Sequence, residues 1–174
     1  NPAAALNAPK GIIANPNCST IICNIVTYPI FKEVGIKRMV VSTYQASSGA
    51  GAAAMEELRQ QARDWVAGRP LTQEIFKRQY IFNLFSHNSK VDLESGYNEE
   101  EIKMRKESAK IFGSSDAAGK WSRVGPTPEQ LFGVTTTCVR VPTLRAHCES
   151  INIQTRMPIT ADRAREILAK APNV

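Results

Sequence analysis

Short segments rich in β-branched apolar residues alternate along this chain with longer segments whose apolar residues recur at helical spacing. This alternation predicts an α+β domain in which helices cover one side of a mixed or antiparallel sheet. The expected strands are residues 10–14, 37–45, 135–142 and 149–156, with a further extended stretch at 78–86. The expected helices are residues 19–28, ending before Pro29, and segments within 46–70, 96–113 and 160–172.

Capping residues set the expected ends of these helices. Ser47 or Ser48 is the expected N-cap of the second helix, which should stop near Gly68. Asn98 and Glu101 have the spacing of a capping box, and Thr160 is the expected N-cap of the last helix. Residues 113–133, rich in Gly, Ser and Pro, predict an exposed loop or insertion.

Composition narrows the class of protein. The 174 residues suit one domain, and no apolar run approaches the roughly 20 residues of a membrane span. The net charge of +6 comes from scattered basic residues, which argues against a nucleic-acid surface. Four cysteines without a C-x-x-C pair and only two histidines argue against a metal site. We expect no disulfide framework and a reducing compartment.

Cys18 lies in "NPNCST", between an Asn-Pro-Asn turn and the first turn of a helix. There the helix dipole and unpaired N–H groups favour the thiolate, the nucleophilic form, although most free cysteines are small buried hydrophobes. We interpret Cys23 and Cys138 as core residues. Cys148 is expected to be partly exposed and receives no role.

A nucleophilic cysteine needs a base, and the only candidates are His147 and His87. His147 lies in a connector between two strands and is the better candidate. His87 lies in the polar turn "FSHNS", where an exposed histidine without a role is the plainer interpretation.

Charged residues raise two further alternatives. Arg140 stands within a β-branched strand, so it either points to solvent or binds a carboxylate as a fork. Glu100 and Lys103 share a helix face, as a solvated ion pair or as ligands for an amino group and an anion. The G-A-G at 49–51 lacks the rest of a dinucleotide fingerprint. These residues fit both a cysteine hydrolase and a dehydrogenase that forms a thioester.

Five motifs together resemble the aspartate-semialdehyde dehydrogenases of the bacterial and plant-like branch. They are "NPNCST", "VVSTYQASSGAGAAAMEEL", "FNLFSHN", "YNEEEIKM" and "TCVRVPTLRAHCES", in this order, and the resemblance covers essentially the whole chain apart from 113–133. It implies the C-terminal catalytic fold of glyceraldehyde-3-phosphate-dehydrogenase-like enzymes. It also implies NADPH-dependent reduction of L-aspartyl 4-phosphate to L-aspartate 4-semialdehyde, with release of phosphate. This reaction serves lysine, methionine, threonine and isoleucine biosynthesis.

The resemblance also implies roles for single residues. Cys18 forms the thioester, His147 takes and returns protons, and Gln45 orients the substrate. Arg140 binds the substrate α-carboxylate, and Glu100 binds its amino group. Lys103 and Asn17 lie toward the phosphate, and Ser48 and Gly49 line the nicotinamide side.

By the same resemblance, residues 1–174 are a catalytic and dimerisation domain, and the N-terminal NADP-binding Rossmann domain and a C-terminal return segment are expected to lie outside this chain. The opening "NPAAALNAPKG" looks like a linker or a cut end. We therefore expect a homodimer without metal, nucleic acid or membrane, in the cytoplasm or in a plastid, and little turnover from this segment alone. The alternatives are a non-catalytic dimerisation module and a cysteine hydrolase. Every version of the catalytic hypothesis requires Cys18 and His147 to meet.

Overall fold

The computed structural model describes residue 6, residues 8–113 and residues 132–174. The chain divides into two compact units. Unit 1 comprises residues 1–41, 102–136 and 151–174, and unit 2 comprises residues 42–101 and 137–150. Three strands pass from one unit into the other, so each unit contains parts of the same sheet.

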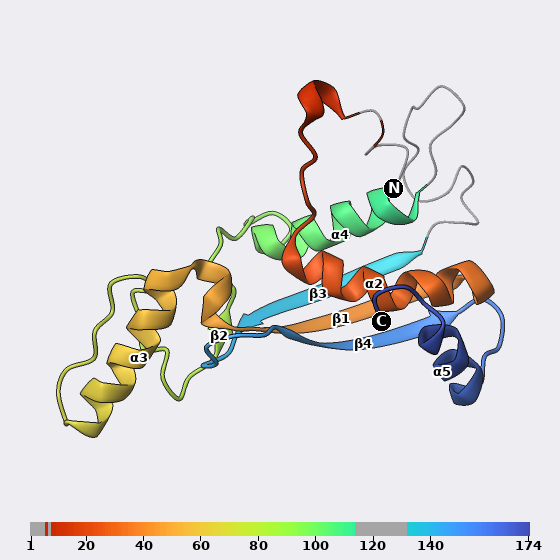
Figure 1. The fold of residues 1–174 in the computed structure, drawn as a ribbon. Helices are drawn as coiled ribbons and strands as arrows, with labels where there is room; N and C mark the ends of the chain where they lie inside the picture. Colours follow the sequence, from red (N-terminus) through yellow and green to blue (C-terminus); the bar gives the residue numbers. More distant parts are fainter. Residues whose placement is uncertain (1–5, 7, 114–131) are drawn as a thin grey trace. The chain divides into compact units, whose positions relative to one another are not determined.

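The described elements confirm the α+β prediction (Figure 1). The sheet has the order β2-β3-β1-β4. The strands are β1 (Ile36–Gln45), β2 (Phe85–Ser86), β3 (Gly133–Arg140) and β4 (Cys148–Thr155). The α-helices are α2 (Cys18–Val34), α3 (Ala52–Val66), α4 (Glu99–Phe112) and α5 (Ala161–Ala169), and two 3₁₀ turns are η1 (Pro9–Gly11) and η2 (Ser47–Ala50).

The sheet is mixed. In unit 2 the Val141 N–H donates to the Gln45 carbonyl (3.1 Å), so β3 and β1 end side by side and run parallel. In unit 1 the Arg156 N–H, just after β4, donates to the Gly35 carbonyl, just before β1 (3.1 Å), so these two strands run antiparallel. β2 pairs with β3 antiparallel, with Phe85 opposite Arg140.

Unit 1 is built on α2, whose N-cap is Asn17. The Asn17 Oδ1 accepts from the Ser19 and Thr20 N–H groups (2.9 and 3.2 Å). The buried Cys23 contacts Met39 of β1 through sulfur (3.8 Å), which packs the helix on the sheet. At the other end of α2, Tyr28 and Phe31 form edge contacts with Phe112 of α4, so an aromatic cluster joins the two helices.

Unit 2 has its own core of Ala54, Leu58, Phe76, Tyr80 and Phe85. Two buried polar side chains of α3 hold the segment that follows this helix. Glu57 accepts from the Glu74 N–H (2.6 Å), and Gln61 accepts from the Tyr80 N–H (2.7 Å). These two side chains of α3 therefore pair several backbone groups of a segment that is not in the sheet.

Several expected boundaries are confirmed. β1, β3, β4 and α5 lie within two residues of their predicted spans, and Thr160 caps α5 by accepting from the Arg163 N–H (3.1 Å). The capping box is reciprocal. The Glu101 N–H donates to Asn98 Oδ1 (3.0 Å), and the Asn98 N–H donates to Glu101 Oε2 (2.9 Å).

Four expectations about secondary structure are wrong. Residues 10–14 form no strand, since Ile12 and Ile13 are 73% and 61% exposed and bury no apolar face. α2 continues through Pro29, because the residues after it gain the aromatic packing that offsets one lost hydrogen bond. Ser47 and Ser48 do not cap α3, whose N-cap is Gly51, and Ser47 Oγ instead donates to the Thr143 carbonyl (3.0 Å). Of the stretch 78–86, only β2 is a strand.

The predicted loop at 113–133 lies almost wholly outside the described residues. No helix in the described ranges is long and apolar enough to cross a membrane.

Candidate active site

Most of the predicted site residues gather in unit 2, where β1 and β3 end together. Gln45 ends β1, Arg140 ends β3, and Ser48 and Gly49 lie in η2. Glu100 lies in the first turn of α4, and His147 lies just before β4. The connector between β3 and β4 is fixed on η2, because the Ser47 and Ser48 N–H groups donate to the Thr143 and Leu144 carbonyls (2.9 and 3.1 Å).

Arg140 is buried, with 2% of its surface exposed, which excludes the solvent-facing alternative. Nη1 donates to the Ala46 carbonyl (3.0 Å), and Nε donates to the Asn88 amide oxygen (2.9 Å). Nη2 lies 2.8 Å from His87 Nε2. These three acceptors are neutral, and the bonds to them orient the plane of the guanidinium. A planar guanidinium held in this way has the geometry that binds a carboxylate as a fork.

His147 lies beside this guanidinium. The Ala46 N–H donates to Nδ1 (3.1 Å), and a backbone amide can only donate, so the proton of the neutral ring is on Nε2. Burial lowers the pKa of His147, the positive charge of Arg140 lowers it further, and Glu100 opposes both. The preceding Ala146 has φ 70°, a costly conformation for alanine that turns the chain just before this histidine.

Gly49 lies directly against both groups. A β-carbon at this position would be 2.9 Å from His147 Nε2 and 3.0 Å from Arg140 Nη1. Only a residue without a side chain fits there, so the backbone of Gly49 packs directly against the imidazole and the guanidinium. We name the group formed by Ala46, Gly49, Arg140 and His147 the arginine–histidine cluster.

Glu100 and Gln45 form a second polar pair in unit 2. Glu100 is 6% exposed, so the interpretation of this residue as part of a solvated ion pair is wrong. Gln45 Nε2 lies 3.4 Å from Glu100 Oε1 and also donates to Thr43 Oγ1 (3.2 Å). A buried carboxylate beside an amide can accept from an ammonium group.

Unit 1 contains Asn17, Cys18 and Lys103. Cys18 is the first residue of α2 and is exposed, as a nucleophile at a helix N-terminus should be. The Asn17 N–H donates to Glu107 Oε2 of α4 (2.8 Å), and Lys103 is exposed on the same helix. Because Cys18 and His147 belong to different units, their meeting remains a prediction.

The other cysteines match their predicted environments. Cys23 and Cys138 are fully buried, and Cys148 is exposed. Burial raises the pKa of the Cys138 thiol to about 12, which keeps it protonated and unreactive. All four cysteines are free, and the described residues contain no group of His, Cys, Asp and Glu that could hold a metal ion.

Sequence reasoning missed two residues of unit 2. His87 is half-buried and contacts Arg140, so the interpretation as an exposed turn histidine is wrong. The signals in the sequence were its place directly after the extended stretch 78–86 and within the motif "FNLFSHN". Glu149 was not singled out, yet both carboxylate oxygens are buried without a hydrogen-bond partner among the described residues. Burial raises the pKa of Glu149 to about 7.

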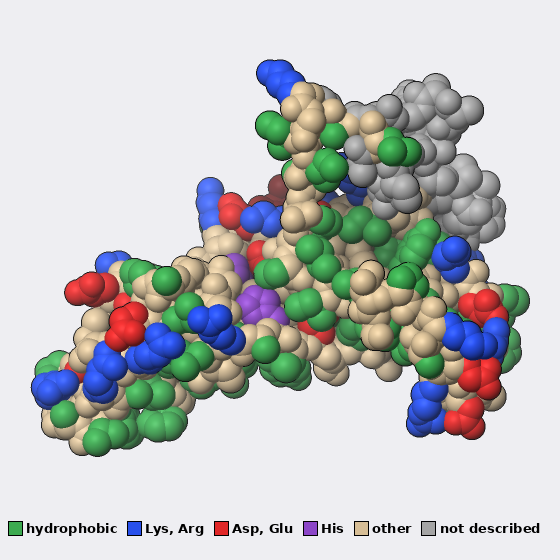
Figure 2. Space-filling model, viewed as in Figure 1, with side chains coloured by type: hydrophobic (Ala, Val, Ile, Leu, Met, Phe, Trp, Pro, Cys, Tyr) green, Lys and Arg blue, Asp and Glu red, His purple; other side chains and the backbone are tan. Residues whose placement is uncertain are grey.

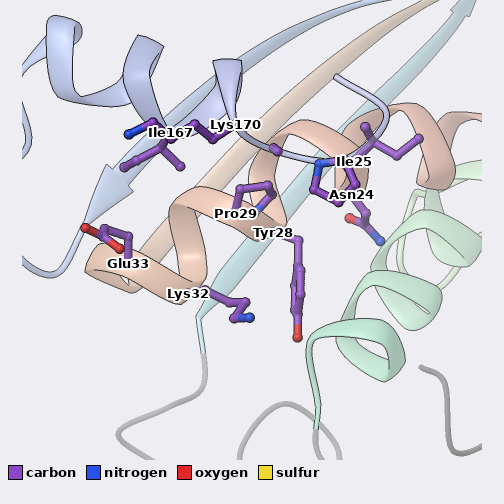
Figure 3. Close-up of a pocket in the computed structure, with 10 residues that line it drawn as sticks. Asn24, Ile25, Tyr28, Pro29, Lys32, Glu33, Ile167 and Lys170 are labelled. Carbon is purple, nitrogen blue, oxygen red and sulfur yellow. The ribbon is translucent and has the colours of Figure 1, made fainter.

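Neither the charge pattern on the surface nor the described pocket identifies a further part of the candidate active site. On the face shown in Figure 2, Lys and Arg alternate with Asp and Glu, and histidine reaches the surface. A pocket of about 440 Å³ in unit 1 lies between α2 and α5, where Pro29 faces Ile167 and Lys170 (Figure 3). None of the predicted site residues lines this pocket.

Comparisons with known proteins agree with this architecture. The family described as semialdehyde dehydrogenase, dimerisation domain, matches residues 28–174. Aspartate-semialdehyde dehydrogenase of Synechocystis sp. is 45% identical over 174 residues, which are 100% of this chain and 46% of the relative. The enzyme of the same name from Prochlorococcus marinus is 46% identical over 95% of this chain and 43% of the relative.

Solved structures give the same answer. The crystal structure of aspartate semialdehyde dehydrogenase II from Vibrio cholerae, complexed with ASA, has a TM-score of 0.82 at 36% identity. That match covers 98% of this chain and 45% of the other. The chain therefore spans a little under half the length of the relatives it matches. It belongs to the semialdehyde dehydrogenase family, of which it carries the dimerisation domain.

Proposed function

We propose that the protein carrying this chain is an aspartate-semialdehyde dehydrogenase, with residues 1–174 as its catalytic and dimerisation domain. The observation that carries the proposal is the buried Arg140 beside a neutral His147. Relatives named for this activity, up to 46% identical, support it. The proposed reaction converts L-aspartyl 4-phosphate to L-aspartate 4-semialdehyde and phosphate.

The first proposed step is acyl transfer to Cys18. Its thiolate attacks the acyl carbon, the new carbon–sulfur bond forms, and the bond to the phosphate oxygen breaks. Phosphate is a good leaving group, and Cys18 is exposed at the first position of α2, where a substrate can reach its sulfur. Lys103 and Asn17 are proposed to lie toward the departing phosphate.

The second proposed step reduces the thioester. NADPH supplies the hydride when it is bound, and Ser48 and Gly49 would hold its nicotinamide side. Gly49 lies directly against His147, which supports a place for this glycine beside the reacting groups. His147, neutral with its proton on Nε2, can donate to the oxygen that becomes negative and recover the proton when the thiolate leaves.

The remaining residues are proposed to orient the substrate. Arg140 would bind the α-carboxylate with its planar fork, Glu100 would bind the α-ammonium group, and Gln45 would hold the acyl group near the sulfur. We also propose that the protein is a homodimer and lies in the cytoplasm, or in a plastid in a plant or alga. The family's description as a dimerisation domain supports the first of these.

The test uses the whole natural protein that carries this chain. Its purified wild type should reduce NADP⁺ with aspartate semialdehyde only when phosphate is present, and Cys18→Ser should abolish this activity. Cys148→Ser is the matched control, since this exposed cysteine has no proposed role and its loss should leave the rate unchanged. Full activity in Cys18→Ser, or a wild type without phosphate-dependent turnover, would refute the proposal.

A further inference from the structure

A second histidine, His87, contacts the guanidinium of Arg140, to which the proposed function gives the substrate carboxylate. His87 follows β2, and the pairing of Phe85 with Arg140 brings its ring to the end of β3. The His87 N–H donates to the Cys138 carbonyl (2.9 Å), which fixes the backbone of this residue on the same strand. The contact is therefore held by the sheet.

The chemistry of the two groups determines the direction of the hydrogen bond. A guanidinium can only donate, so the His87 Nε2 atom, 2.8 Å from Arg140 Nη2, must accept. The neutral ring then carries its proton on Nδ1, which lies 3.0 Å from Ser89 Oγ and donates to it. The Ser89 N–H also lies 3.2 Å from Nδ1, a geometry that suits the other tautomer. The shorter, charge-assisted bond to Arg140 decides between the two.

Asn88 completes the arrangement from the next position in the chain. Its amide oxygen accepts from Arg140 Nε (2.9 Å), while His87 accepts from Nη2. Two adjacent residues thus hold neighbouring nitrogens of one planar group, and the Ala46 carbonyl holds the third. The plane of the guanidinium is fixed before any ligand arrives, which removes part of the ordering cost of binding.

We propose that His87 is a positioning residue, which with Asn88 fixes the guanidinium plane of Arg140 for the carboxylate of the substrate. This inference rests on the proposed function. Removing the His87 acceptor should weaken substrate binding much more than it slows the chemical step. The substrate carboxylate is remote from the reacting carbon, so it is bound in the ground state and in the transition state alike.

The decisive variant is His87→Leu, studied in the whole natural protein. A lost hydrogen bond to a charged group should raise KM for aspartate semialdehyde by about tenfold to a hundredfold, with kcat changed less than about threefold. KM for phosphate should stay within about twofold of wild type. His87→Gln keeps an acceptor near the place of Nε2 and should restore KM to within about threefold of wild type.

Two further variants separate positioning from folding. Asn88→Ala removes a side chain from an exposed residue and should raise KM in the same direction, even if His87→Leu does not fold. Leu93→Ala changes a 92% exposed residue of the same connector and should leave all constants unchanged. An aldehyde that keeps the amino group but lacks the carboxylate should be used equally poorly by wild type and by His87→Leu.

The possible failures are distinguishable. A wild type without phosphate-dependent turnover would refute the proposed function and this inference together. If the wild type shows normal turnover but KM for aspartate semialdehyde is unchanged in folded His87→Leu or Asn88→Ala, only the inference is refuted. An equal loss in His87→Gln and His87→Leu would also refute it, because it would point to packing of the ring and not to its acceptor.

Discussion

The substitution Gly49→Ala tests the geometry of the arginine–histidine cluster directly. Carbon atoms and their neighbours are normally separated by about 3.5–4.0 Å, whereas the new β-carbon would lie 2.9 Å from His147 Nε2 and 3.0 Å from Arg140 Nη1. One of these groups must therefore move by roughly 0.5–1 Å. No positive φ is involved at this glycine, so the backbone itself accepts alanine.

The expected result is a large loss of activity with little loss of stability. A displacement near 1 Å of a positioned group can reduce kcat/KM by about a hundredfold, or roughly 2.7 kcal/mol of transition-state stabilisation. Weakening the bond from the Ala46 N–H to the ring costs about 1 kcal/mol of folding free energy. The smaller entropy of the unfolded alanine chain offsets about 0.4–1 kcal/mol of this.

The assay is phosphate-dependent reduction of NADP⁺ by the whole natural protein, together with urea unfolding of the same samples. Gly133→Ala is the matched control, because its β-carbon would meet only Arg38 Cγ at 4.0 Å, an ordinary contact. If Gly49→Ala kept kcat/KM within about threefold of wild type, the close approach of Gly49 to His147 would have no functional meaning.

Three further predictions concern single groups. Iodoacetamide at neutral pH should label the exposed Cys18 and Cys148 well before the buried Cys23 and Cys138, as peptide mass spectrometry can show, and equal rates would contradict the described burial. Burial raises the pKa of Glu149 to about 7 from 4.5, so the folded state holds the proton more tightly than the unfolded state. As pH rises from 4.5 to 7, the free energy of unfolding should therefore fall by roughly 3 kcal/mol. Glu149→Gln should therefore raise the midpoint of thermal unfolding more at pH 8 than at pH 5, and an equal shift at both would argue against a buried, titrating carboxyl. Thr160→Ala should lower the free energy of unfolding, measured in urea, by about 1 kcal/mol, and Thr160→Asn, which keeps a capping side chain, by much less. An equal loss in both variants would show that the cap of α5 does not contribute.

Local signals predicted most of the elements and failed where tertiary packing overrode them. The capping box at Asn98 and the cap at Thr160 were predictable because the donor and acceptor lie within three residues of each other. The strand expected at 10–14 failed because β-branched residues form a strand only beside a neighbour. α2 passes through Pro29 because Phe31 packs against Phe112, a contact that no local pattern contains.

The sequence by itself determined most of the strands and helices and the chemical types available to a site, since these depend on periodicity, caps and side-chain identity. It also identified Arg140 and His147 as candidates, but it left the burial of the arginine and the tautomer of the histidine open. The tertiary structure decided both, because the partners of each side chain are distant in the chain; the carbonyl and the N–H of Ala46, which contact Arg140 and His147, are about 100 residues away. The contact of His87 with Arg140 has the same origin, since strand pairing brings together residues that are 53 positions apart.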